Sequence, residues 1–242
     1  MVKSCLFSIS KKENTVINRL KTMARIALFI YSLIGALNIL SAVIEQPLLR
    51  TVTKPLLMPM LLLYVFSQTH ILIRNKLIFI LVFAWLGDVF LLFQGNSPLY
   101  FQLGLGSFLI MQIGYIRLFS SQSSAGYFNV AQWFSLSIIP VLIYVVGFLA
   151  FLLPRIPAAL YIPVGLYAVA LGSMLYAAFL RKMDSSYYFI FIGAIFFIIS
   201  DSLLALAKFY YSFPGNSIMI MGTYIPAQLL LILGLCKLQP KN

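Results

Sequence analysis

The sequence predicts an all-α integral membrane protein: a bundle of eight transmembrane helices with both termini in the cytoplasm. Three observations lead to this fold class. First, 62% of the 242 residues are hydrophobic and only 9% are charged, whereas soluble domains hold about half apolar and about a quarter charged residues. Second, the apolar residues form eight runs of roughly the 20 residues that cross a bilayer. Third, Lys and Arg favour alternate connections between those runs.

The eight apolar runs are separated by short polar connections. In chain order they cover residues 25–44, 54–69, 76–93, 100–119, 134–153, 157–180, 187–208 and 218–236. They must be helices, because lipid offers no hydrogen bonds to exposed backbone, and they lack the alternating pattern of outer-membrane β-strands. The first run has spanning length and no small-residue cleavage site, which indicates a retained span and not a signal peptide.

The positive charges predict the orientation. Thirteen of the 17 Lys and Arg residues fall on the side of the N-terminus, and only Arg50, Lys54, Arg155 and Lys208 fall on the other. By the positive-inside rule, both termini are cytoplasmic. We therefore expect a basic cytoplasmic segment over 1–24, a transmembrane domain over 25–236 and a cytoplasmic tail over 237–242. We expect an integral multi-pass membrane protein, which in a bacterial host would lie in the plasma (inner) membrane.

Several function classes are disfavoured. The net charge of +12 is scattered among apolar runs without a basic-aromatic sheet pattern, so we expect no nucleic-acid partner. Cys5 and Cys236 lack metal-ligand spacing and are expected to be free thiols. The only histidine, His70, falls in a connection beside Arg74, where it is expected to be solvated. These features argue against Ser-His-Asp or Cys-His catalysis and against a histidine-rich metal site, and no cofactor is expected.

Two acidic residues lie inside apolar runs, Asp88 in the third and Asp201 in the seventh. A charge there costs from about 2.5 to well over 10 kcal/mol, which by default indicates a functional role. At about 1.5 Å per residue, the two lie roughly 18 and 21 Å along their helices from the cytoplasmic side. Both positions are just outside the midplane, in the half of the bilayer that also holds Lys54 and Lys208.

A pair of carboxyls in a low dielectric tends to share one proton, so it can act as general acid and general base together. We therefore predict Asp88 and Asp201 as catalytic residues. Three other interpretations remain open. Asp-Lys ion pairs could simply hold helices together, or the acids could relay protons in a transporter. The protein could also be a non-catalytic lipid-binding or assembly protein. The transporter would use an internal duplication of four spans in each half of the chain. Two similar strings indicate such a repeat, F-A-W-L-G-D-V-F-L-L (83–92) and F-F-I-I-S-D-S-L-L-A (196–205). Chance similarity between apolar helices also explains these strings.

Five strings, in order and in register, resemble the lysoplasmalogenase family, also called YhhN-like, over most of the chain from about residue 25. Each string alone is weakly specific, whereas five in register are more specific. They are T-K-P-L-L-M-P-M-L (53–61), L-G-D-V-F-L-L (86–92), L-G-L-G-S-F-L-I-M-Q-I-G-Y (103–115), S-D-S-L-L-A-L-A-K-F (200–209) and T-Y-I-P-A-Q-L-L (223–230).

The resemblance implies an eight-helix membrane hydrolase. It would cleave the vinyl ether bond of lysoplasmalogens with water, giving a fatty aldehyde and glycerophosphoethanolamine or glycerophosphocholine. The lysine-proline, glycine-aspartate and serine-aspartate positions of the family correspond to Lys54, Asp88 and Asp201. One departure is Gln112, where many relatives carry a histidine.

This substrate suggests roles for the remaining polar residues. A cation near the outer interface attracts a lysolipid phosphate, so we assign Lys54 and, second, Lys208 to it, although a snorkelling side chain at a helix end explains Lys208 equally well. Tyr224 fits either an interface aromatic or a pocket hydroxyl. The amides of Asn38, Gln112 and Gln228 are further candidates for substrate binding, although most such amides bond to neighbouring helices.

Overall fold

The computed structural model describes residues 2–68, 73–122 and 135–237, with side chains from Thr15 onward. These residues form α1 (Val2–Val43), α2 (Pro47–Ser67), α3 (Arg74–Leu92), α4 (Pro98–Ser120), η1 (Leu136–Ile138), α6 (Ile139–Leu152), η2 (Leu153–Arg155), η3 (Ala158–Leu160), α7 (Tyr161–Phe179), α8 (Tyr187–Phe209) and α9 (Asn216–Cys236). Eight helical stretches in this part of the chain are long and apolar enough to cross a membrane. The predicted all-α fold is confirmed, and the protein is an integral multi-pass membrane protein.

Two helices begin well before the apolar runs that predicted them. Helix α1 is continuous through residues 2–24, the segment expected to precede the first span. Helix α2 begins at Pro47 and includes Arg50 and Lys54 in its first turns. By hydropathy, an apolar run ends at a charged residue. A helix, however, can carry cations near the membrane surface, because their long side chains reach the interface.

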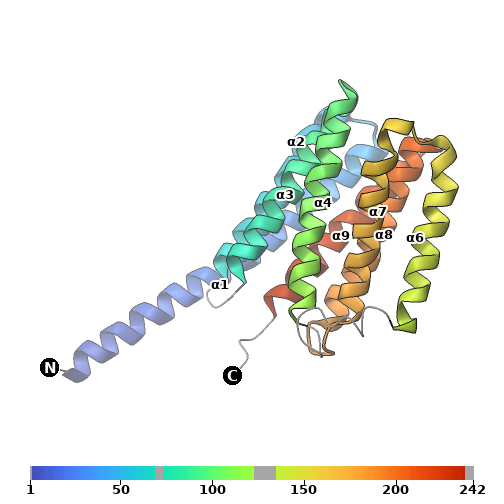
Figure 1. Ribbon diagram of the computed structural model, residues 1–242. Helices are drawn as coiled ribbons and strands as arrows, with labels where there is room; N and C mark the ends of the chain where they lie inside the picture. Colours follow the sequence, from blue (N-terminus) through green and yellow to red (C-terminus); the bar gives the residue numbers. More distant parts are fainter. Residues whose placement is uncertain (1, 69–72, 123–134, 238–242) are drawn as a thin grey trace.

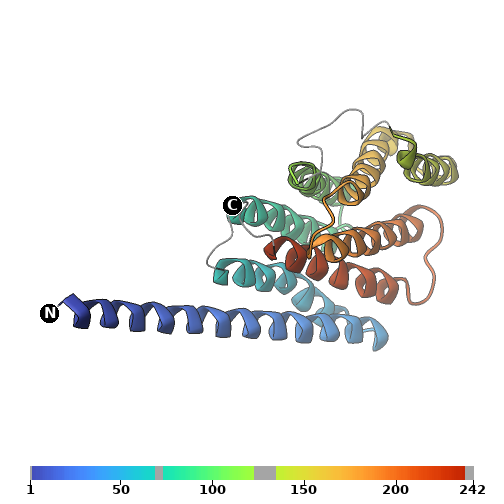
Figure 2. The same ribbon diagram turned by 90° about the horizontal axis from the view of Figure 1, so that it is seen from below.

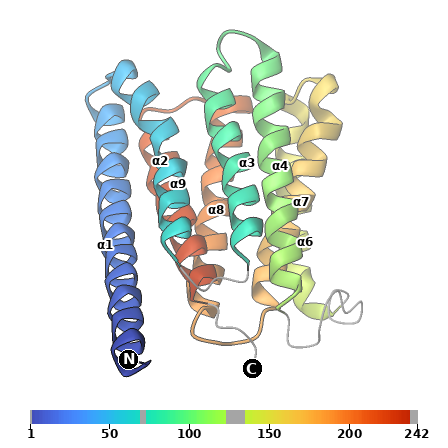
Figure 3. The same cartoon turned by 90° about the vertical axis from the view of Figure 1, so that its left-hand side faces the viewer.

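The helices form one bundle in which α1 and α6 lie at opposite edges (Figures 1 and 2). The most extensive contacts join α8 to α9, α1 to α2 and α3 to α4. Helix α4 also packs against α7, and α2 against α3. The N-terminal part of α1 and the end of α9 point to the same end of the bundle (Figure 3), as an even number of spans requires.

Two prolines in α2 help to fix its position against α3. Pro59 has no N–H, so the carbonyl of Pro55 four residues earlier lacks its helical partner. Trp85 of α3 donates its Nε1–H to that carbonyl at 3.0 Å. Because Pro55 follows Lys54 directly, this bond holds Lys54 at a defined height beside α3.

A glycine allows α3 and α4 to approach closely at the same level. A Cβ at Gly87 would lie 2.8 to 2.9 Å from three ring atoms of Phe108. Such distances are well below van der Waals contact, so any larger residue would force the Phe108 ring or one of the helices to move. Gly87 thus permits the close α3–α4 contact one residue before Asp88.

Candidate active site

A polar cavity of about 250 Å³ lies among α2, α3, α4, α8 and α9. Its wall carries two cations, Arg50 and Lys54, and two carboxyls, Asp88 and Asp201. The two acids come from helices more than a hundred residues apart in the chain, and the fold turns both toward one space. This arrangement brings together the two predicted catalytic residues and one of the predicted substrate-binding lysines.

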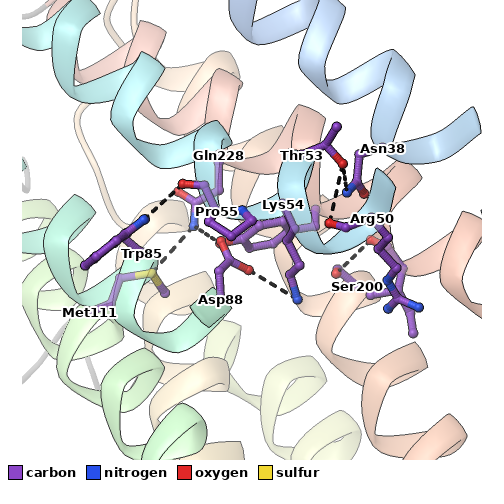
Figure 4. Close-up of polar contacts among 12 residues, drawn as sticks. Asn38, Arg50, Thr53, Lys54, Pro55, Trp85, Asp88, Met111, Ser200 and Gln228 are labelled. Carbon is purple, nitrogen blue, oxygen red and sulfur yellow. Dashed lines mark hydrogen bonds and ion pairs between the residues drawn. The ribbon is translucent and has the colours of Figure 1, made fainter. Parts of the chain in front are cut away.

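Asp88 is buried and held at both carboxylate oxygens. Oδ1 lies 3.5 Å from the Nζ of Lys54, and Oδ2 accepts a 2.8 Å hydrogen bond from the hydroxyl of Tyr224 on α9. Figure 4 shows the lysine of α2 reaching toward the aspartate of α3. A cation and a hydroxyl donor both favour the charged form of a carboxyl group.

A buried chain of hydrogen bonds holds Tyr224 on the side away from the cavity. The Nε2 of Gln228 lies 3.4 Å from the Tyr224 hydroxyl, and its Oε1 accepts a 3.1 Å bond from Tyr115 of α4. Gln228 does not line the cavity. The structure therefore places Gln228 as a support for Tyr224, while Tyr224 itself faces the cavity.

Asp201 has different surroundings. Its Oδ2 accepts a short hydrogen bond from the hydroxyl of Tyr167 on α7, and within the described chain no Lys or Arg forms an ion pair with it. The preceding Ser200 donates to the carbonyl of Ile220 at 3.1 Å, which ties α8 to α9. The two acids of the cavity thus differ: Asp88 has a cation and a hydroxyl, and Asp201 has a hydroxyl only.

Arg50 lies one helical turn before Lys54, and both side chains line the cavity. Its Nη1 donates to Ser217 of α9 at 2.9 Å. With Lys54 paired to Asp88, Arg50 is the cation of this wall that has no acidic partner in the described residues. It is placed to attract an anionic group of a ligand.

The other predicted binding residues do not themselves line the cavity. Lys208 is exposed, donates to Gln94 at 3.2 Å and lies 4.8 Å above the ring of Phe101. Asn38 is buried and donates to Thr53 at 2.8 Å, next to Lys54. Gln112 is fully buried, and neither of its amide atoms has a hydrogen-bond partner among the described residues.

The expectations for His70 and for the side chain of Cys5 lie outside the described residues. Cys236 is a free thiol, as expected. In the part of the chain with described side chains, no three His, Cys, Asp or Glu residues gather as a metal ion would need.

Sequence reasoning missed two residues of the site. Arg50 had a usable signal, since a position four residues before Lys54 falls on the same helix face. Tyr167 had none, because it is one of several tyrosines in an apolar helix and only tertiary packing brings it to Asp201. Both therefore enter the candidate site from the structure.

Comparisons with known proteins agree on one family. The sequence profile of the YhhN family matches residues 49–235. Lysoplasmalogenase TMEM86A of Homo sapiens is 33% identical over 159 residues, which cover 63% of this chain and 62% of that protein. The Bos taurus protein of the same name is 30% identical over equal shares. Lysoplasmalogenase TMEM86B of Mus musculus is 38% identical over 84 residues, 35% of each chain.

These alignments span less than two thirds of the relatives' own lengths. No solved structure matches the chain.

Proposed function

Because this chain belongs to the YhhN family, with relatives named lysoplasmalogenase, we propose that it is a membrane hydrolase that cleaves the vinyl ether bond of lysoplasmalogens. The products are a fatty aldehyde and a glycerophosphoethanolamine or glycerophosphocholine. The observation that carries the proposal is the pair Asp88 and Asp201, which line one cavity together with Arg50 and Lys54. This set offers two groups for proton transfer and cations for a phosphate.

The reaction begins with a proton on carbon. A vinyl ether has the order glycerol oxygen, Cα, Cβ and chain, and its π electrons take a proton at Cβ. The resulting oxocarbenium ion, with its positive charge shared by Cα and oxygen, captures water at Cα to give a hemiacetal. The hemiacetal then breaks its bond to the glycerol oxygen and releases the aldehyde.

The different neighbours of the two acids assign them different catalytic roles. Asp88, beside Lys54 and Tyr224, is the ionised partner that removes a proton from the attacking water. Asp201, without a cation of its own, is the acid that protonates Cβ. When the hemiacetal breaks down, Asp88 returns its proton to the leaving glycerol oxygen and Asp201 takes the hydroxyl proton. Both groups are thereby restored.

The cations have separate roles in this proposal. Lys54 stays with Asp88 and keeps its carboxylate oriented, and Arg50 binds the phosphate of the lysolipid from the neighbouring turn of α2. With both termini in the cytoplasm, as the Lys and Arg distribution indicates, the cavity lies in the outer half of the bilayer. We propose that orientation as part of the function.

The test is aldehyde release from lysoplasmenylethanolamine and lysoplasmenylcholine by purified protein in detergent, where no gradient exists to drive transport. Wild-type protein should release aldehyde, and Asp88→Asn and Asp201→Asn should each lower the rate by at least about 100-fold. Both variants should elute as wild type does in gel filtration.

A folded wild-type protein that releases no aldehyde from either lysoplasmalogen would refute the proposal. In that case proton-coupled uptake into vesicles becomes the next measurement.

A further inference from the structure

A second cavity adjoins the polar one and is almost entirely apolar. It lies among α3, α4, α6, α7 and α8 and has a volume of about 50 Å³. Its wall includes Leu105, Phe148, Leu149, Val164, Leu171 and Ala205. Such a narrow apolar space suits a single unbranched hydrocarbon chain and excludes a charged head group.

The two cavities share part of their walls. Leu91, Phe108, Asp201 and Leu204 line both of them. Asp88, Lys54 and Arg50 line only the polar cavity, whereas Tyr167 lines only the apolar one. Asp201 is therefore the carboxyl group at the junction, and its hydrogen-bond donor Tyr167 holds it from the apolar side.

We propose that the apolar cavity is the binding site for the first carbons of the substrate's hydrocarbon chain, which places the vinyl ether at Asp201. This inference rests on the proposed hydrolase function. A lysoplasmalogen changes from polar to apolar at its vinyl ether, and the protein changes from polar to apolar at Asp201. With the chain in the apolar cavity, Cβ is the reacting carbon nearer to Asp201, and Cα is nearer to the water beside Asp88.

The site acts by alignment more than by affinity. The chain is surrounded by hydrocarbon both in the bilayer and in the cavity, so moving it between them releases little hydrophobic free energy. Holding the first carbons in one direction instead fixes Cβ near the proton donor, and correct orientation is a large source of rate enhancement.

The position of α6 is compatible with loading from the membrane. Helix α6 lies at an edge of the bundle (Figure 1), and Phe148 and Leu149 on it line the cavity. On the same wall, the hydroxyl of Tyr144 is hydrogen-bonded to Ser202 of α8, the residue after Asp201. The chain site is thus bounded by the helix with the smallest buried share among the eight spans.

The experiment is photo-crosslinking with a lysophosphatidylethanolamine whose chain is joined by a saturated ether and carries a diazirine within four carbons of the ether oxygen. The saturated ether cannot be hydrolysed, so labelling reports binding alone. Labelled peptides should map to α6 and to the facing parts of α7 and α8, and unlabelled lysoplasmenylethanolamine should compete.

Matched alanine substitutions test the position. Ala205→Leu and, as a second variant, Ala168→Leu fill the cavity, whereas Ala207→Leu adds the same atoms to α8 outside the cavity wall. The first two should lower labelling at least about fivefold, the lower end of what an overpacked site costs. Ala207→Leu should label as wild type does, and all three proteins should match wild type in gel filtration.

Labelling that maps to other helices, or that is equal in Ala205→Leu and Ala207→Leu, would overturn the chain site. The proposed function is judged separately by aldehyde release. Correct labelling without aldehyde release retains the site and refutes the hydrolase, and aldehyde release with labelling elsewhere does the reverse.

Discussion

Lys54 of α2 and Asp88 of α3 form an ion pair inside the helix bundle, with 3.5 Å between Nζ and Oδ1. The Asp88 side chain is 2% exposed and that of Lys54 is 9% exposed. Removing one partner from such a pair leaves an uncompensated charge, which costs more than removing both. The pair therefore links the stability of the α2–α3 contact to the charge of the candidate catalytic base.

A double-mutant cycle measures that link. Lys54→Met leaves the Asp88 carboxylate without its cation and should destabilise the protein by about 3 kcal/mol or more. Lys54→Met combined with Asp88→Asn removes both charges, while the asparagine oxygen can still accept from Tyr224. The double variant should therefore melt at a higher temperature than Lys54→Met in the same detergent. With wild type and Asp88→Asn completing the cycle, a coupling energy of zero between the two substitutions would show that the ion pair contributes nothing to stability.

Much of the fold could be predicted because lipid restricts what a chain can form. Backbone hydrogen bonds must be satisfied within each segment, so eight apolar runs become eight helices. The same restriction singled out Asp88 and Asp201, since a carboxyl group in an apolar run carries a high cost that can be read from the sequence alone. Neither inference needed knowledge of tertiary contacts.

The parts of the site that were not predicted depend on the direction of side chains. Helices in lipid are apolar on all sides, so the sequence cannot tell a lipid-facing leucine from one that lines a cavity. For this reason the apolar cavity and Tyr167 were missed. Lys208 was predicted as a substrate ligand from its height in the membrane, and in the structure its amine donates to Gln94, a residue of the polar cavity wall; its role stays a prediction.

The phosphate contact is predicted to belong to Arg50 and not to Lys208. Arg50→Gln removes a cation from the cavity wall and should raise KM for both lysoplasmalogens about tenfold, the affinity of one charge-assisted hydrogen bond. Lys208→Gln removes an exposed cation outside the wall and should leave KM within about twofold of wild type. Steady-state kinetics with each head group provides the measurement. A larger effect of Lys208→Gln would move the phosphate to the end of α8.

Close packing at Gly87 is expected to be essential for the geometry of the site. Gly87→Ala would place a methyl group 2.8 to 2.9 Å from ring atoms of Phe108, a residue that lines both cavities. Forcing the ring or the helix to move should cost about 1 to 3 kcal/mol. The matched control is Gly106→Ala, because no atom lies within 4 Å of that added methyl.

Thermal unfolding in detergent and aldehyde release measure the two effects of these substitutions. Gly106→Ala should be neutral or slightly stabilising, since alanine favours a helix by about 1 kcal/mol over glycine. Gly87→Ala should lower both the melting temperature and the rate. If the two glycine variants behave alike, the contact with Phe108 does not set the spacing of α3 and α4.

The two acids should not be equivalent in kinetics. Protonation of Cβ is the step that creates the oxocarbenium ion, so Asp201→Asn should reduce kcat more than Asp88→Asn does. In Asp88→Asn, the acid at the junction of the cavities remains, and water can still capture the cation without a base at a reduced rate. General acid or base catalysis typically accelerates a reaction about 100-fold to 10,000-fold. The rate of Asp88→Asn should therefore be lower than that of wild type by a factor within this range.

A solvent isotope effect tests which step Asp201 performs. Because the transferred proton exchanges with solvent before it reaches carbon, the wild-type rate should fall in D₂O, and the residual rate of Asp88→Asn should fall as well. A buffer matched in viscosity with glycerol separates this effect from slower diffusion. If Asp88→Asn is the more damaged variant, and the residual rate of Asp201→Asn still falls in D₂O, the roles are reversed. The proton donor would then be the carboxyl group paired with Lys54.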